Sequence, residues 1–270
     1  MRGSSIFWGG VLILLGIFLL LDNLGLLAVF GVSVWNLVWP AFLILLGLWF
    51  LWGTVFRRPI ADEQVSIPNQ GADAARIRLD HGAGRLYINA GAQAGNLLEG
   101  TFTGGLDHRV RLNGNTLQVE LRVPAQNFMF FPFWWNSGSG HRWDLVLNRD
   151  ISLDLDIKSG ANEARLDFSD LLVKDLRLQT GASSTDLTVP AYAGYTRAEV
   201  KTGVASVTIY IPATVAARIQ SRGGLSEVKI DSNRFRRTGD RYESPDYETA
   251  ENKIDLSIEV GVGSVKVLSR

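Results

Sequence analysis

The sequence of 270 residues contains no cysteine, and its charge is balanced, with 27 Lys and Arg against 27 Asp and Glu. The absence of cysteine excludes a disulfide scaffold, a Cys-ligated zinc site, an iron–sulfur protein and a thiol nucleophile. Nucleic-acid binding calls for a basic surface, and a neutral chain gives no support to it. The sequence therefore predicts no nucleic-acid partner.

Charged side chains are nearly missing from the first 56 residues, where only Arg2 and Asp22 carry charge. All the others lie in residues 57–270, which have the composition of an ordinary soluble domain. The apolar part is also rich in tryptophan, with Trp8, Trp35, Trp39, Trp49 and Trp52. The chain thus consists of an apolar N-terminal fifth and a globular remainder.

Two uncharged runs in the apolar part, Ser5–Leu21 and Leu37–Phe56, are close to the length that a membrane-spanning helix needs. A secretory signal peptide is the alternative for the first run, but no small-residue cleavage site follows it promptly. A buried pair of core helices is the alternative for both, but a surface helix of a soluble protein would show a polar face. We therefore predict a two-helix membrane anchor over residues 1–58.

The two runs repeat a short motif, because residues 12–16 and 43–47 both read Leu-Ile-Leu-Leu-Gly. Small residues let membrane helices approach closely, which makes helix–helix packing plausible. The glycines expected to serve this packing are Gly10, Gly16, Gly47 and Gly53.

Basic residues set the expected orientation of this anchor. Arg2 precedes the first run, and Arg57 and Arg58 follow the second, whereas the connecting turn has no Lys or Arg. Positively charged flanks stay in the cytoplasm. With two spans, both termini and the globular remainder are expected on the cytoplasmic side of the cell membrane.

After a predicted linker at residues 59–75, the chain changes to short segments rich in Val, Ile, Leu and Thr and broken by glycine, which is typical of strands and turns. Six segments share one pattern, in which a glycine is followed six residues later by an aliphatic residue. These glycines are Gly82, Gly160, Gly181, Gly203, Gly224 and Gly261.

The middle four of these glycines are 21, 22 and 21 residues apart. A fixed period of this size is typical of stacked repeats that bury a common core. We therefore predict a β-solenoid over residues 76–270, with a β-sandwich as the alternative. The glycines are expected to supply a positive φ at a tight corner.

The repeat has two departures. The stretch between Gly82 and Gly160 is long enough for an insertion or irregular rungs. The stretch between Gly224 and Gly261 contains a charged segment, residues 234–253, which we interpret as a solvated loop or a terminal cap.

Both parts of the chain resemble known families. The first 56 residues resemble the transmembrane region shared by the LiaI and LiaF envelope-stress proteins, in the hydrophobic pair, the stretch Asn23-Leu24-Gly25-Leu26-Leu27, and Trp39-Pro40 at the start of the second run. The glycine-punctuated remainder resembles the toastrack β-domain, an adhesin-like roll that often follows it in bacterial proteins. The resemblance implies a membrane-anchored regulator of cell-envelope stress responses, which in some members restrains a two-component sensor kinase. It brings no catalytic residues with it.

The residues give no support to catalysis either. His81, His108 and His141 lack the spacing of a metal site. Asp154 and Asp156 share one face of a strand and could do acid–base work or bind a cation, but their alternation with leucines fits a solvent-exposed face equally well. Neither a nucleotide-binding loop nor a hydrolase elbow is present. We predict a protein that is not an enzyme and holds no cofactor or metal.

One segment stands apart from the repeat, because it is almost entirely aromatic and is followed by a Ser- and Gly-rich run. Its contact residues are Phe128, Met129, Phe130, Phe131, Phe133, Trp134 and Trp135. It could cap the solenoid or fill a core, or it could form an exposed tip that contacts a membrane or a protein.

These observations favour a membrane-anchored regulatory or scaffolding protein that acts through protein–protein contacts, or through contacts with the membrane surface. The expected partners are the lipid bilayer, a membrane sensor kinase or another envelope protein, and a second copy of the chain. The alternative is an extracytoplasmic, adhesin-like structural protein of the envelope.

Overall fold

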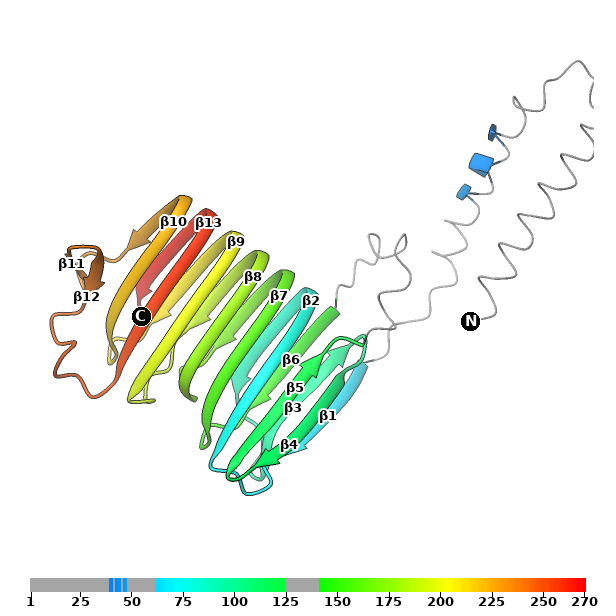
Figure 1. The fold of residues 1–270 in the computed structure, drawn as a ribbon, viewed down its shortest axis with the longest axis horizontal. Coiled ribbons are helices and arrows are strands. Elements are labelled where there is room, and N and C mark those ends of the chain that lie inside the picture. Colours follow the sequence, from blue (N-terminus) through cyan, green and yellow to red (C-terminus); the bar gives the residue numbers. More distant parts are fainter. Residues whose placement is uncertain (1–38, 41, 45, 48–61, 125–140) are drawn as a thin grey trace, which may run out of the picture. The chain divides into compact units, whose positions relative to one another are not determined.

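The computed structural model describes residues 39–40, 42–44, 46–47, 62–124 and 141–270 (Figure 1). The chain divides into two compact units, residues 1–59 and 60–270. In the first unit the described residues are helical, and the rings of Trp39 and Phe42 stack with centroids 5.7 Å apart. In the described ranges, no helix has the length and apolar character required to cross a membrane. The run Ser5–Leu21 and most of Leu37–Phe56 lie outside these ranges.

The described part of the second unit forms one sheet of 13 strands. The strands are β1 (Asp62–Pro68), β2 (Ala74–Ala90), β3 (Asn96–Thr103), β4 (Asp107–Asn113), β5 (Thr116–Arg122), β6 (His141–Leu147), β7 (Ser152–Asp167), β8 (Leu172–Thr188), β9 (Tyr195–Ile211), β10 (Ala216–Ile230), β11 (Arg236–Thr238), β12 (Arg241–Glu243) and β13 (Lys253–Ser269). The all-β class predicted for this part of the chain is confirmed.

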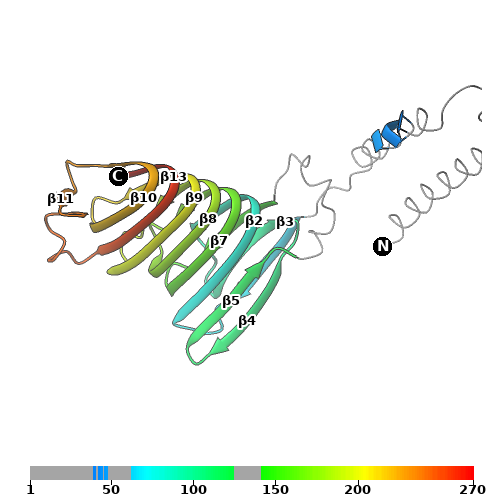
Figure 2. The ribbon, with the colours of Figure 1, turned by 45° about the horizontal axis from the view of Figure 1, so that its top comes forward.

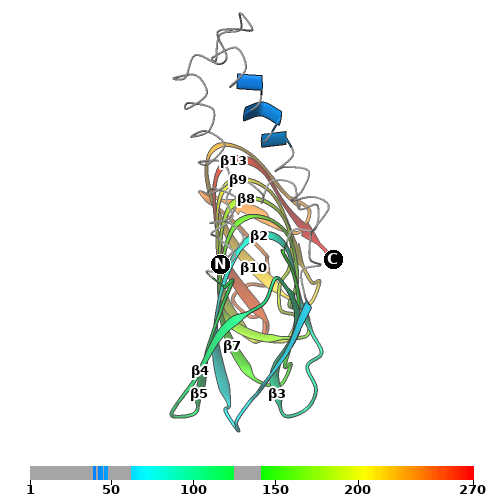
Figure 3. The ribbon, with the colours of Figure 1, turned by 90° about the vertical axis from the view of Figure 1, so that its right-hand side faces the viewer.

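Six long strands pair in parallel, in the order β2-β7-β8-β9-β13-β10 (Figure 1). Each curves at its middle, so that a first arm and a second arm face each other when the stack is viewed along its length (Figure 3). Only residues 168–171 separate β7 from β8, which is enough because the arms bring the two ends of a strand together. We call each long strand a rung. Parallel rungs in register are the pairing of a solenoid, whereas a β-sandwich is built from antiparallel sheets.

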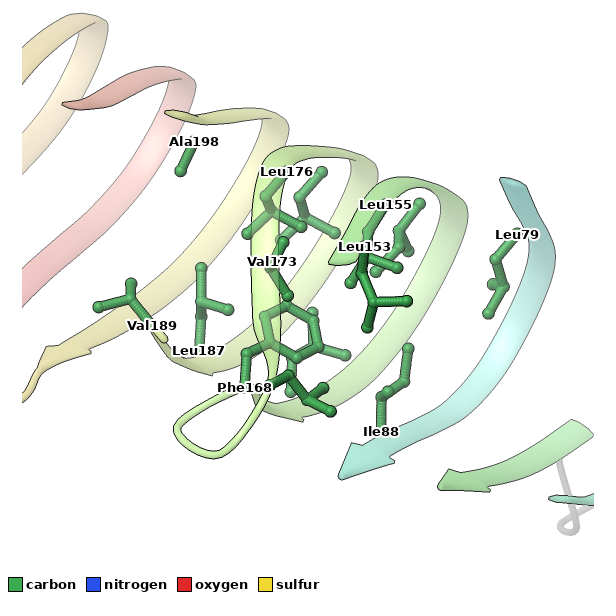
Figure 4. Packing of buried hydrophobic residues seen from close by; sticks show 14 of the residues in the cluster. Leu79, Ile88, Leu153, Leu155, Phe168, Val173, Leu176, Leu187, Val189 and Ala198 are labelled. Atoms are coloured by element: carbon green, nitrogen blue, oxygen red, sulfur yellow. The ribbon is translucent and has the colours of Figure 1, made fainter. Parts of the chain in front are cut away.

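The core lies between the two arms, because apolar residues alternate with polar ones along each arm and point inward. Leu153, Leu155 and Leu176 of the first arms are buried, as are Ile88 and Leu187 of the second arms (Figure 4). Fully burying one such side chain stabilises the fold by roughly 1.5–3 kcal/mol. The repeat therefore stacks apolar columns that no single rung could bury alone.

The repeat glycines stack at the bend, as the register shows: Ser159 pairs with Thr180 and Ala161 with Ala182, which places Gly160 opposite Gly181. The expected positive φ is wrong for Gly160, Gly181, Gly203 and Gly261, none of which has φ in the left-handed region. The physical reason for glycine is close approach. A Cβ on Gly181 would lie 2.8 Å from the carbonyl oxygen of Gly160, and the other three meet the preceding glycine in the same way.

At the N-terminal end of the stack, the sheet splits into two branches (Figure 2). The first arm of β2 pairs with β5, which pairs with β4. The second arm of β2 pairs with β6, followed by β3 and β1. Strands β5 and β6 thus pair with the two arms of β2 as the two halves of one more rung, with residues 123–140 between them in the sequence. The long interval between Gly82 and Gly160 contains this broken rung and two antiparallel strands.

The predicted linker at residues 59–75 is corrected by β1, because Asp62–Pro68 pairs with β3 as an edge strand. The segment escaped notice because only one of its residues, Ile67, is fully buried. Its charged and polar remainder resembles a linker in composition.

At the C-terminal end, the last strand does not lie last. β13 inserts between β9 and β10 and pairs with both in parallel. The segment between β10 and β13 returns to the edge of β10, where β12 pairs antiparallel with residues 218–220. Arg218 there binds Glu243 at 2.8 Å and Glu248 at 2.7 Å. The charged segment 234–253 therefore covers part of the terminal rung.

Candidate interaction surface

Because the rungs are in register, side chains at equivalent positions form straight rows along the outside of the stack. An open groove of about 980 Å³ runs along the bend and is lined in part by the stacked glycines. We call it the bend groove. It extends from β2 to β10 and is lined by the glycines and by the two residues that precede each of them.

One wall of the bend groove is a charged row, formed by the residue two positions before each glycine. Its members are Asp80, Lys158, Gln179, Lys201, Glu259 and Arg222. Within it Lys201 lies 2.7 Å from Glu199 and 3.7 Å from Glu259, and its hydrogen bond to Glu199 raises its pKa. Asp80 binds Arg122 of β5 at 3.2 Å, which extends the row to the broken rung.

An apolar row follows directly after the glycines. Its described members are Ala83, Ala161, Ala182, Val204 and Val262. Val204 is 61% exposed and Val262 is 47% exposed. The bend interrupts the alternation of inward-facing and outward-facing residues along the arms. As a result, the glycine and the aliphatic residue after it both face outward.

The outer face of the first arms is a network of ion pairs. Arg76 of β2 binds Asp154 of β7 at 3.0 Å, and Arg78 binds Asp156 at 3.2 Å. The two aspartates thus share a face, as the sequence predicts, and the face is the solvent-facing one. Each carboxylate is matched by an arginine of the neighbouring rung, which is a structural role.

The structure brings together two of the three histidines that the sequence scatters. His81 is 2% exposed at the bend of β2, and its ring lies edge-on to Trp143 with centroids 5.1 Å apart. Burial lowers the pKa of His81 to about 4, and burial also lowers the pKa of His141 at the start of β6. His108 lies exposed on β4. Across the described ranges, no three His, Asp or Glu side chains gather into a group that could hold a metal ion.

Comparison with protein families identifies both parts of the chain. Residues 57–210 match the family model described as the N-terminal domain of toast_rack, DUF2154, which covers more than half of the chain. The chain belongs to the toast-rack family. Residues 6–51 of this toast-rack protein match the LiaI-LiaF-like transmembrane region, which indicates that the chain is anchored in a membrane. Neither model is that of a known enzyme family.

One solved structure shares the fold of this chain, and a second is similar only weakly. A candidate cell adhesion protein from Clostridium sporogenes ATCC 15579 is 21% identical, and the alignment covers 78% of this chain and 99% of that one with a TM-score of 0.71. A candidate adhesin from Bacteroides fragilis NCTC 9343 is 9% identical over 77% of this chain and 97% of that one, but its TM-score is only 0.26. No curated protein matches the sequence.

Most residues that the sequence singles out for contacts lie outside the described ranges of the toast-rack chain. These are Gly10, Gly16, Gly53 and the aromatic segment 128–135. Gly47 is described, and a Cβ placed on it would meet nothing within 4 Å. The described strand residues on either side of this segment lie at the bend, where Arg122 pairs with Asp80 and His141 pairs with Gly84.

Sequence reasoning missed the bend groove and the apolar row beside it. The signal was present, since each repeat glycine except Gly224 is followed by Ala or Val, and a polar or charged residue precedes each of them by two positions. Its meaning depends on knowing that the residue after the glycine faces outward, which alternation along a strand does not predict.

Proposed function

We propose that this protein is a membrane-anchored regulator or scaffold in cell-envelope stress signalling, and that it acts through protein–protein contacts. The observation that carries the proposal is the union in one chain of a LiaI-LiaF-like transmembrane region and a toast-rack domain. The anchor concentrates the β-domain at the membrane, where a sensor kinase or another envelope protein would meet it.

The surface of the rung stack supports a binding role over a catalytic one. Long rows of side chains offer an extended platform of the kind that repeat proteins use for recognition. Asp154 and Asp156 are the candidates for acid–base chemistry in the sequence. Both carboxylates form ion pairs with arginines. The proposal therefore assigns no catalytic residues and no cofactor.

Arg2, Arg57 and Arg58 support a cytoplasmic location for both termini and for the β-domain, with two membrane spans. Packing through Gly10, Gly16, Gly47 and Gly53 would join this anchor to a partner's helices or to a second copy of the chain. The cytoplasmic side is the one on which the kinase domains of two-component sensors act.

Deletion of the gene in the native host tests the proposal. We expect the deletion to change transcription of envelope-stress genes, and the full chain to restore the wild-type pattern. Residues 60–270 alone, without the anchor, should fail to restore it. Unchanged transcription, both at rest and under a cell-wall-active antibiotic, would overturn the regulatory role.

The second candidate is an extracytoplasmic, adhesin-like structural protein. The observation that favours it is the shared fold with the Clostridium sporogenes protein, which is described as a candidate for cell adhesion. For this candidate the deletion strain would lose cell–cell or surface attachment while its envelope-stress transcription stayed constant. The same strain thus separates the two functions.

A further inference from the structure

The apolar row at the bend is unusual among the outward positions of the rungs. Three residues after each glycine, the outward residue is polar in every described rung: Arg85, Glu163, Ser184, Ser206, Ser264 and Glu227. One residue after the glycine, the residue is Ala or Val and lies open to solvent from β7 to β13. A contiguous exposed apolar strip bordered by polar residues marks a surface that binds something.

The charged row across the bend groove adds a positive excess to this strip. With Arg122 it contains four cations, and its acids are Asp80 and Glu259. Lys158 and Arg222 are exposed and form no ion pair with any described residue. Two cations of the row are therefore available to an anionic partner.

The geometry of the two rows fits a flat partner. Neighbouring rungs are about 4.8 Å apart, so the two rows run parallel to each other along the stack. A row of small aliphatic side chains beside a row in which cations outnumber acids by four to two matches the layering of an anionic bilayer surface, with acyl chains below and phosphates at the level of the Lys and Arg heads.

We propose that the bend of the rungs is a membrane-docking edge, which lies on a bilayer surface containing anionic phospholipid. Val204 and Val262 enter the interfacial layer, and Lys158 and Arg222 bind the lipid phosphates. The proposal depends only on the membrane anchoring of the chain and not on its regulatory role. Docking on either leaflet would satisfy it.

Spin labels on the full chain test this proposal, and the chain has no cysteine of its own to interfere. Val204→Cys carries the label at the bend, and Ser184→Cys carries a matched label on the exposed outer face of the second arm. Each variant is reconstituted in phosphatidylcholine vesicles with or without phosphatidylglycerol. Relaxation by oxygen, which enters the bilayer, is compared with relaxation by a water-soluble nickel chelate, which does not.

We expect phosphatidylglycerol to raise oxygen relaxation and lower nickel relaxation at residue 204, with no such change at residue 184. Lys158→Gln combined with Arg222→Gln should lower the ratio of docked to undocked chains by about fivefold for each charge. The matched pair Arg85→Gln with Lys266→Gln, on the outer face of the second arm, should leave the ratio unchanged. A residue 204 label that remains as accessible to nickel as the residue 184 label in anionic vesicles would overturn the proposal.

Discussion

The bend glycines are the residues on which the rung stack most directly depends. In Gly181→Ala the new Cβ would lie 2.8 Å from the carbonyl oxygen of Gly160, which is backbone and cannot rotate away. We expect the free energy of unfolding to fall by about 1–3 kcal/mol, the usual cost of overpacking. Urea unfolding of residues 60–270 measures this, because that unit has a core of its own.

Ser184→Ala is the matched control, since Ser184 is exposed on the outer face of the same rung. A surface substitution there should change stability by no more than about 0.5 kcal/mol. If Gly181→Ala unfolds at the same urea concentration as Ser184→Ala, the rungs do not approach each other as closely as described.

The positions of these glycines could be predicted from the sequence, but their reason could not. The sequence reveals Gly160, Gly181 and Gly203 because they recur at a regular interval along the chain. Their function is to admit the carbonyl oxygen of the neighbouring rung, and that contact exists only between rungs. A tight corner with positive φ and a close approach between two backbones both require glycine, so the sequence alone does not distinguish them.

His81 makes the stability of the β-domain depend on pH. Burial lowers its pKa from 6.5 to about 4, so between these values the unfolded chain binds a proton that the folded chain does not. Stability therefore falls as pH decreases through this window, by about 3 kcal/mol in total. His81→Phe keeps an aromatic ring beside Trp143 and removes the titration.

The measurement is the unfolding free energy of both proteins between about pH 7 and pH 4. As pH falls, the free energy of unfolding of His81→Phe should rise relative to that of the wild type by about 3 kcal/mol. His141 is present in both proteins, and its charge acts on His81, so the difference between them also contains this coupling. A difference that stays constant with pH would show that His81 is not buried in its neutral form.

At the scale of elements, Arg234 holds the turn between β9 and β10. Its guanidinium donates hydrogen bonds to four backbone carbonyls within residues 211–215, at 2.5 to 3.1 Å, and to Ser269 Oγ at 2.8 Å. One side chain thus joins the turn to the end of β13. The planar fork of arginine makes this possible, and lysine has no equivalent.

We expect Arg234→Lys to lower the unfolding free energy of residues 60–270 by about 2 kcal/mol, since hydrogen bonds from a charged donor are lost at a partly buried site. Arg236→Lys is the control, because Arg236 is exposed and forms no ion pair among the described residues. Thermal unfolding compares the two variants. Equal midpoints would mean that the bonds of Arg234 contribute nothing to the turn.

The sequence predicts the strands themselves but not the order in which they lie in the sheet. The alternation of Leu153, Leu155 and Ile157 with polar residues predicts strands, and the structure contains them. The insertion of β13 between β9 and β10 could not be predicted, because all rungs share one register and any order would align their glycines. The broken rung of β5 and β6 could not be recognised in the sequence, because residues 123–140 separate its two strands in the chain and interrupt the regular period of the repeat.

At the scale of the whole molecule, composition predicted the division into a membrane anchor and a β-domain. The positions of the bend groove and its rows depend on the strand topology. The shortage of charge before residue 57 indicated an anchor, and the match of residues 6–51 to a transmembrane family supports it. The bend groove and its rows exist only once six rungs are stacked. They could not be located from any one repeat.

The side of the membrane on which the β-domain lies separates the two proposed functions, a cytoplasmic regulator and an extracytoplasmic adhesin-like protein. Ser232→Cys places a single thiol at an exposed turn of a chain that otherwise has none. The wild-type chain serves as the unlabelled control for a membrane-impermeant maleimide. For a cytoplasmic β-domain, we expect the maleimide to label Ser232→Cys only after the cells are permeabilised. Labelling in intact cells would show that the β-domain lies outside the cytoplasm.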